Sequence, residues 1–220
     1  MHTRILQALG IALALAPAVA LAQQKPTAAT YITDEEVKKV NSLPGVDRQI
    51  RVVDIGNENF AVGIVHRGAT GAARGGAGAA AGRAGGAAGR GAAAQAEPCG
   101  DQSGPTPPAG TAGGISHDSQ TEGYLIVSGG GTMVTGGKIS HGRKSPPENE
   151  VTTTLNGPSC SGPIVGSDVV RKEVKVGDIV IIPAGVPHGW AEIADHVDYL
   201  SFRPSDHVLT AGYVNPAIKK

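Results

Sequence analysis

From residue 50 onward, apolar and polar residues alternate along the chain with a period of two, which is typical of half-buried β-strands. The first two such segments are 50–55 and 60–64, separated by the turn 56–59. After residue 114 short apolar segments return, and glycine-rich turns such as 129–131 and 136–137 divide them. The strands predicted there are 115–117, 124–127, 132–134, 152–155, 169–176, 178–182, 188–192 and 197–202. Many short strands with glycine turns and little helix predict an all-β sandwich or barrel.

One short helix is expected before the first strand. Thr33 and Glu36 have the spacing of a capping box, in which each side chain binds the backbone N–H of the other residue. Pro44 and Gly45 are strong stop signals, so the helix should end at about Asn41. A helix this short depends on packing against the rest of the domain for its stability.

A low-complexity insertion at 68–114 interrupts the strand pattern. Up to residue 94 it is almost entirely glycine and alanine with three arginines, and a proline- and glycine-rich stretch follows. Such a segment has little to bury and much backbone entropy to lose, so we expect a disordered loop. The chain then divides into a flexible lead at 23–32, the helix and outer strands at 33–67, the insertion, and the main strand region with a C-terminal tail at 115–220.

The first 22 residues are expected to be a secretory signal peptide. Arg4 supplies a positive start, and residues 5–16 are almost wholly apolar. Ala20 and Ala22 then provide the small residues of a cleavage site before Gln23. The apolar stretch is too short and too broken to span a bilayer. We therefore expect a periplasmic or secreted protein with no membrane span after cleavage.

Export changes the expectation for the two cysteines, Cys99 and Cys160. An oxidising compartment permits a disulfide between them, which would stabilise the domain by about 4 kcal/mol in the chain-entropy model. The alternative is two unpaired thiols. Neither cysteine has a partner at the spacing of a zinc–thiolate site.

The charge balance narrows the range of partners. Lys and Arg together equal Asp and Glu in number, giving a formal net charge of zero, and aromatic residues make up only 3%. A chain without a basic surface or a set of stacking aromatics is poorly suited to bind nucleic acid. We therefore expect a small-molecule partner and no nucleic acid.

Two stretches carry the candidate chemistry. In the first, His117 is followed by Glu122 and then by Gly129. In the second, Gly177 precedes a mostly apolar run, the sequence Pro-Ala-Gly at 183–185, and His188. In their order and spacing, these stretches resemble the two consensus motifs of the cupin superfamily.

The resemblance implies a double-stranded β-helix, the jelly-roll barrel of the cupins. It also implies a divalent transition metal (iron, manganese, nickel or zinc) held by His117, Glu122 and His188. Two imidazoles and one carboxylate suit such a metal and leave positions open for a ligand. Gln120 is a fourth candidate ligand, because some cupins recruit an amide between the His and the Glu.

The chain departs from the consensus at two positions. The first motif usually opens with a further His, where this chain has Ile115. Since cupins that have lost their metal exist, metal binding and loss of the metal both stay open. The last position of the second motif is usually Asn, and here it is Glu192.

Glu192 is the candidate catalytic residue. It lies at even spacing from His188, so alternation along a strand would turn both side chains toward one cavity. There the carboxylate would act as a general base or orient a histidine. The alternative is an exposed carboxylate at the rim of the barrel.

Several other residues have two interpretations each. Arg203 follows the last predicted strand, where it would bind a substrate carboxylate or pair with Asp206. The aromatic side chains of Tyr124, Trp190 and Phe202 would be pocket walls or ordinary core. The remaining histidines are expected at the surface; they include 66, 141, 196 and 207.

Three classes of function fit these observations. The first is a metal-dependent enzyme acting on a small oxygen-bearing molecule, as an oxygenase, isomerase, lyase or decarboxylase. The second is a binding protein that captures a small molecule or metal without chemistry. The third is a structural role through a homodimer, with the insertion as an interaction arm. Because cupins share one fold across very different reactions, the fold alone does not choose among them.

Overall fold

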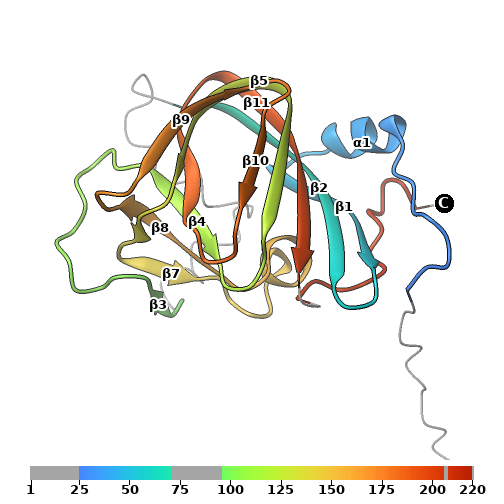
Figure 1. The fold of residues 1–220 in the computed structure, drawn as a ribbon, viewed down its shortest axis with the longest axis horizontal. Helices are drawn as coiled ribbons and strands as arrows, with labels where there is room; N and C mark the ends of the chain where they lie inside the picture. The colour runs from blue at the N-terminus through green and yellow to red at the C-terminus, as the bar shows by residue number, and fades with distance from the viewer. Residues whose placement is uncertain (1–24, 71–95, 206–207, 220) are drawn as a thin grey trace, which may run out of the picture.

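A computed structural model describes residues 25–70, 96–205 and 208–219 (Figure 1). The predicted signal peptide and residues 71–95 of the insertion lie outside the described residues. Within them, no helix is long and apolar enough to cross a membrane. The elements are α1 (Asp34–Asn41), β1 (Asp47–Asp54), β2 (Asn59–Thr70), β3 (Pro98–Cys99), β4 (Gly113–His117), β5 (Glu122–Thr135), β6 (Lys138–Ile139), β7 (Gly142–Lys144), the π-helical turn η3 (Val151–Asn156), β8 (Ser159–Val165), β9 (Val170–Lys175), β10 (Ile179–Ile182) and β11 (His188–Ser205).

The eleven strands form one antiparallel sheet that wraps into a jelly-roll barrel without closing completely (Figure 1). The two longest strands, β5 and β11, pair with each other and bend across both halves of the barrel. On one side, β2 and β1 continue from β11, and β10 pairs with β5. On the other, β4, β8, β7 and β3 continue from β11, and β9 pairs with β5. The predicted all-β barrel with a short N-terminal helix is confirmed.

Residues 122–135 form one strand, although the glycines at 129–131 were predicted to be a turn between two strands. Gly130 and Gly131 stay in the ladder opposite Lys175 and Val174 of β9. A Cβ on either glycine would meet the backbone of a neighbouring strand, so these positions allow β5 to bend while its pairing continues. The predicted break between 192 and 197 is likewise an irregularity within β11.

Residues 151–156 form a π-helical turn, so the strand predicted at 152–155 is wrong. Thr152 and Thr153 both donate their backbone N–H groups to the carbonyl of Asn149. The Thr152 hydroxyl also donates to the carbonyl of Pro146. These local bonds satisfy the backbone without a ladder and outweigh the β-propensity of the threonines. Strand β8 was not predicted, because its Gly162 and Pro163 disrupt the alternating pattern.

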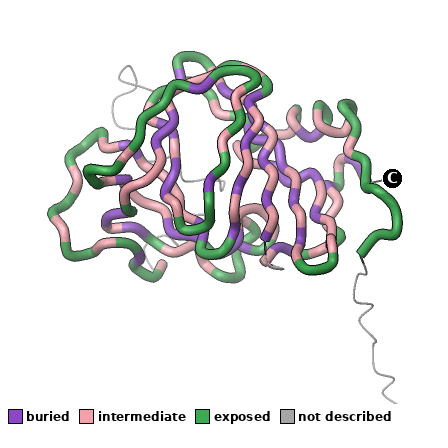
Figure 2. Tube along the Cα trace, in the orientation of Figure 1, coloured by how far each residue is buried: buried purple, intermediate pink, exposed green. Residues whose placement is uncertain are grey.

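The helix forms where the capping box predicts it. The Thr33 hydroxyl accepts from the Glu36 backbone N–H, and the Glu36 carboxylate accepts from that of Thr33. Its inner face buries Val40 against Ile50 and Ile64 of the outer strands. Figure 2 shows this buried side of the helix facing the sheet, while its outer turns are exposed. The helix therefore closes one flank of the barrel by hydrophobic packing.

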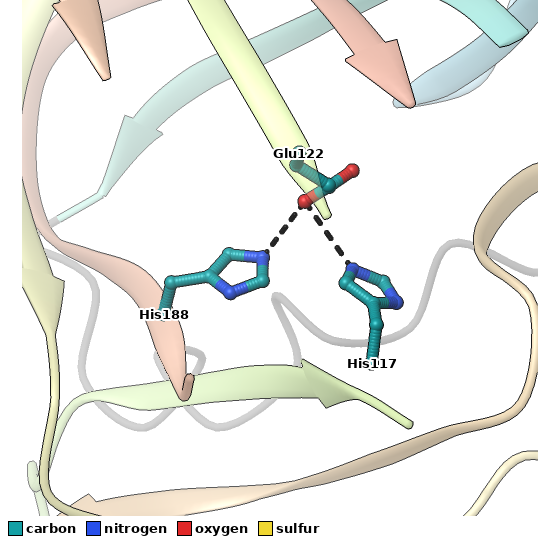
Figure 3. Close-up of side chains that lie close together, drawn as sticks. All are labelled: His117, Glu122 and His188. Atoms are coloured by element: carbon teal, nitrogen blue, oxygen red, sulfur yellow. Dashed lines mark ion pairs between the residues drawn. The ribbon is translucent and has the colours of Figure 1, made fainter. Parts of the chain in front are cut away.

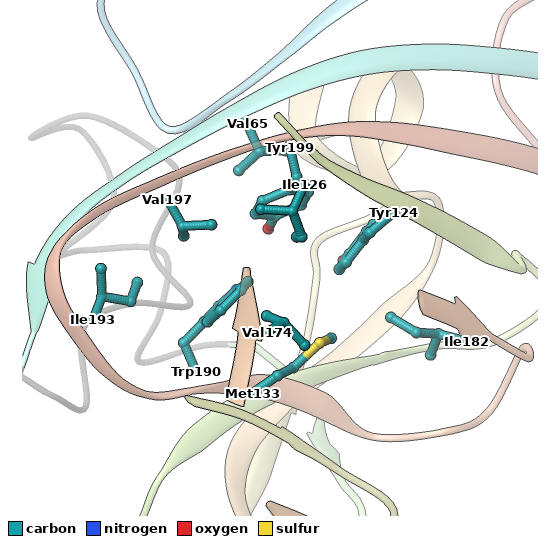
Figure 4. Close-up of a cluster of buried hydrophobic side chains, with 10 residues drawn as sticks. All are labelled: Val65, Tyr124, Ile126, Met133, Val174, Ile182, Trp190, Ile193, Val197 and Tyr199. Carbon is teal, nitrogen blue, oxygen red and sulfur yellow. The ribbon is translucent and has the colours of Figure 1, made fainter. Parts of the chain in front are cut away.

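The largest hydrophobic cluster fills the barrel between its two halves, and its side chains point toward one another (Figure 4). Tyr124 and Tyr199 have ring centroids 4.3 Å apart, and Trp190 lies 5.8 Å from Tyr199. The members of this cluster are Val65, Tyr124, Ile126, Met133, Val174, Ile182, Trp190, Ile193, Val197 and Tyr199. Tyr124 and Trp190 thus belong to the core, and both also line a cavity, so each of the two interpretations holds in part.

Cys99 and Cys160 form a disulfide with a Cα–Cα distance of 5.9 Å. The bond joins β3 to β8, and Cys99 also pairs with Gly142 of β7 in the ladder. The second part of the insertion, 96–112, is therefore a loop anchored to the barrel at one end by a covalent bond and a short strand. The first interpretation of the two cysteines is confirmed.

We expect the Cys99→Ala/Cys160→Ala double variant to lose about 4 kcal/mol of free energy of unfolding, because a loop spanning 61 residues is no longer closed in the unfolded chain. Urea denaturation of both proteins measures the difference. A reducing agent should lower the stability of the wild type to that of the variant and leave the variant unchanged. Equal stability of the oxidised wild type and the variant would contradict the prediction.

Candidate metal centre

Each of the three predicted metal ligands stands at the end of a strand. His117 is the last residue of β4, Glu122 the first of β5, and His188 the first of β11. The loop before β11 is held against β4, because the Gly185 backbone N–H donates to the His117 carbonyl at 2.7 Å. Close contact of the strands is possible because Gly189 has no side chain; a Cβ there would collide with the backbone of β4.

The three side chains converge on one point in the interior (Figure 3). The Nε2 atom of His117 lies 3.2 Å from Oε2 of Glu122, and Nε2 of His188 lies 2.9 Å from the same oxygen. All three side chains are at most 3% exposed. Among the described residues this is the one group of His, Cys, Asp and Glu with ligand atoms this close together. The cluster could hold a metal ion.

The orientation of His188 favours a cation between it and Glu122. Its Nδ1 lies 3.0 Å from the carbonyl of Val186, which can only accept, so Nδ1 carries a hydrogen. In a neutral ring, Nε2 then turns its lone pair toward a carboxylate oxygen, another acceptor. Two acceptors 2.9 Å apart repel each other unless a proton or a metal ion lies between them. A backbone partner that fixes the tautomer is also typical of metal-binding histidines.

A fully buried guanidinium group holds the other oxygen of Glu122. The Nε–H of Arg203 donates to Oε1 at 2.7 Å, and the Ser201 hydroxyl donates to the same oxygen at 3.2 Å. The Tyr124 hydroxyl donates to Oε2 at 2.6 Å. Glu122 therefore offers only Oε2 to the two histidines, which makes it a one-oxygen ligand.

Arg203 is itself fixed by groups from other parts of the chain. Its Nη2 pairs with Asp47 at 2.5 Å, and its Nη1 donates to the side chain of Gln49 and the carbonyl of Leu155. Glu122, Arg203 and Asp47 thus form a chain of alternating charges in the interior. Such hydrogen bonds between ionised groups are stronger and more directional than neutral ones.

This chain of charges keeps Glu122 ionised. Burial by itself would raise the pKa of the Glu122 carboxyl, but the interactions with His117, with the charge of Arg203 and with His188 hold that pKa well below its usual range. The same interactions act on Tyr124, whose pKa is raised by burial and by the charge of Glu122. The centre therefore presents a carboxylate, rather than a carboxylic acid, beside a neutral phenol.

The residues of both cupin-like motifs thus meet at one buried point inside an antiparallel barrel. The chain has a cupin fold. No protein-family model matches the chain, and no curated protein matches it.

Solved structures that are similar to the chain share little sequence identity with it. DMSP lyase DddQ from Ruegeria pomeroyi DSS-3 is 10% identical, with 89% of this chain and 84% of that chain covered and a TM-score of 0.34. A recombinant oxalate oxidase in complex with glycolate is 11% identical, with 86% of this chain and 61% of that chain covered and a TM-score of 0.31. Likenesses this distant carry no argument about what the present protein binds, so the site is interpreted from its own residues.

Gln120 lies in the turn between His117 and Glu122, and its side chain is buried. Neither its amide oxygen nor its amide nitrogen has a hydrogen-bond partner. A buried amide without a partner is unfavourable, so the site would be stabilised by a group that binds it. Gln120 therefore stays a candidate fourth ligand.

Glu192 is exposed and is not brought into the cluster. The register of β11 against β5 shifts between Trp190 and Glu192. As a result the buried residues are even-numbered at His188 and Trp190 but odd-numbered from Ile193 onward. Glu192 therefore faces outward, although its spacing from His188 is even. The expectation that it shares a cavity with His188 is therefore not met, because a bulge reverses the alternation of the strand.

Arg203 does not have the substrate-binding role considered from the sequence. It is buried and engaged by Glu122 and Asp47, so it is not available to a substrate carboxylate. Asp206 lies outside the described residues. The alternation of β11 could have indicated this buried position. The inner face of the strand carries residues 199, 201, 203 and 205, all of which are buried. An arginine on that face needs a buried partner. Nothing in the sequence pattern indicated Asp47 as that partner.

The other histidines have partners away from the cluster. His66 pairs with Asp198 at 2.6 Å and is 46% exposed. His196 contacts the Ser128 hydroxyl and Asp195, and His141 contacts the Ser140 hydroxyl. His207 lies outside the described residues. The predicted surface location holds for His66, whereas His196 and His141 are partly buried.

We expect Arg203→Met to lower the free energy of unfolding by about 3–5 kcal/mol, because Glu122 and Asp47 would stay buried without their shared cation. Chemical denaturation measures the loss. Lys138→Met is a matched control: it breaks an ion pair with Asp101 at the surface, where Lys138 is 60% exposed, and should leave the stability nearly unchanged. Similar small effects for both variants would show that the buried charges are not coupled as described.

Proposed function

We propose that this cupin binds a divalent transition metal through His117, Glu122 and His188, and binds a small molecule beside it. The observation that supports the metal most directly is the buried contact of His188 Nε2 with Glu122 Oε2, two acceptors that a cation would bridge. Iron, manganese, nickel and zinc all accept such a set of imidazole and carboxylate ligands. With only three ligands, positions are left for another molecule.

A metal held there would supply Lewis-acid polarisation to an oxygen-bearing ligand, which isomerase and lyase chemistry can use, and a redox-active metal such as iron would supply electrons to an oxygenase. The protein's own residues orient the centre. Arg203 and Ser201 fix Glu122 Oε1, and Val186 fixes the ring of His188. Burial keeps bulk water away from the ligand atoms. A non-catalytic binding protein would use the same arrangement without turnover.

We expect the purified protein to contain about one divalent metal ion per chain, and the His117→Ala and His188→Ala variants to contain almost none. Elemental analysis after dialysis against a weak chelator measures the content. The His66→Ala variant is the matched control, because it removes a histidine outside the cluster and should retain the metal. Equal metal content in all four proteins, or none in the wild type, would contradict the proposed function.

We further propose that the protein is exported. The disulfide supports this, since such bonds form and persist mainly in oxidising compartments. The apolar segment at 5–16 behind Arg4 supports it as well.

We expect the protein expressed with its first 22 residues to be recovered from the periplasm or medium with a mass that begins at Gln23. Cell fractionation followed by intact-mass measurement tests this. A variant that lacks residues 2–22 is the control and should stay in the cytoplasm. Cytoplasmic recovery of the full-length chain at its uncleaved mass would contradict export.

A further inference from the structure

We propose that Ser128, His196 and Asp195 form a second active site at the surface, in which Ser128 is the nucleophile of acyl transfer from esters with a good leaving group. The three side chains have the hydrogen-bond order of a Ser–His–Asp triad, which is recognised by geometry and roles rather than by order in the sequence. The site shares no residue with the candidate metal centre. The inference therefore goes beyond the proposed function and does not depend on it.

Hydrogen bonds join the three side chains in one direction. His196 Nδ1 lies 2.7 Å from Oδ2 of Asp195. Because a carboxylate oxygen accepts, Nδ1 carries the hydrogen, and the neutral ring then has its lone pair on Nε2. Ser128 Oγ lies 2.8 Å from this Nε2 and donates its hydroxyl proton to it. The imidazole is thus placed to take the proton of the serine as a general base.

An irregularity in β11 brings His196 to Ser128. Residues 193–196 of β11 stand opposite only 130–131 of β5, so β11 bulges there. Gly129 follows Ser128 with a φ of +64°, and a Cβ on it would collide with the backbone carbonyl of His196. The glycine therefore allows the bulge to approach β5 closely enough for the His196 ring to reach the serine. Bulges often direct side chains in this way next to active sites.

The triad is open to solvent. The side chain of His196 is 33% exposed and that of Asp195 is 91% exposed, while Ser128 is partly buried. The ring of His66 lies beside that of His196, with centroids 6.1 Å apart and planes 25° from parallel, which limits rotation of the imidazole. An ester can thus reach Ser128 from bulk water, but a surface site offers it few contacts. We therefore expect low affinity and little selectivity for the acyl group.

The reaction has two acyl-transfer steps. Ser128 Oγ forms a bond to the acyl carbon while its proton moves to His196 Nε2, and the bond to the leaving oxygen breaks as the leaving group takes that proton. A water molecule then attacks the acyl carbon in the same way, which releases the acid and restores the serine. General-base catalysis contributes about 10²–10⁴-fold, so Ser128 should react at least about a hundredfold faster than an ordinary exposed serine.

A fluorophosphonate probe tests the proposal, because the Oγ–P bond that it forms is stable and fluoride leaves. After brief treatment of the full-length protein, peptide mass spectrometry should find at least about a hundredfold more adduct at Ser128 than at Ser103. Ser103 is the internal reference, since it is exposed and donates directly to Asp101 with no imidazole between them. His196→Ala should reduce the labelling of Ser128 to the level of Ser103. Ser103→Ala is the matched control and should leave the labelling of Ser128 unchanged.

A second pair of variants tests Asp195 as the positioning residue of the imidazole. Asp195→Ala should lower the rate of labelling about tenfold, whereas Asp195→Glu, which keeps a carboxylate, should restore most of it. With p-nitrophenyl acetate, an acetyl group should appear on Ser128, and this adduct should be absent from Ser128→Ala. Dialysis against EDTA should not change the labelling of Ser128, because no member of the triad belongs to the candidate metal centre.

Each contrary result overturns the proposal. Equal labelling of Ser128 and Ser103 shows that Ser128 is an ordinary serine, and unchanged labelling in His196→Ala shows that the histidine is not its base. Full labelling in Asp195→Ala, or the same loss in Asp195→Glu as in Asp195→Ala, removes the carboxylate from the triad. Loss of labelling after dialysis against EDTA assigns the reaction to the metal centre and leaves no separate site.

Discussion

The buried ion pairs of Arg203 with Glu122 and Asp47 are the constraint on which the rest of the site depends. A guanidinium in the interior is tolerable only when carboxylates accept its N–H groups, and here they come from strands far apart in sequence. Asp47 opens β1, Glu122 opens β5, and Arg203 lies near the end of β11. The same contacts that satisfy the charge therefore fix the position of these strands and turn a single oxygen of Glu122 toward the histidines.

The barrel supplies what these contacts need. The long strands β5 and β11 bend across both halves, so residues from their ends meet in the interior next to the main hydrophobic cluster (Figures 1 and 4). His117 and His188 reach the same point because β4 and the loop before β11 are held together by a backbone hydrogen bond. Because the cluster is buried at the junction of several elements, a change in any one of them would alter the ligand geometry.

A cavity lies beside the candidate metal centre and shares His188 with it. Three side chains from the protein would leave a metal incompletely coordinated, and Ile115 lines the adjacent cavity with a side chain that cannot be a ligand.

The sequence by itself determined the elements and the candidate ligands whose signals are local. The capping box predicted α1, alternation predicted most of the strands, and two spaced motifs identified His117, Glu122 and His188. Only the tertiary structure decided that Glu192 faces outward, because a bulge in β11 reverses the alternation on which its inward prediction rested. It also decided that Arg203 binds Glu122 and Asp47, since 156 residues separate Arg203 from Asp47 and no local pattern relates them. Spacing determines which side chains are available, whereas strand register and the pairing of buried charges determine which of them meet.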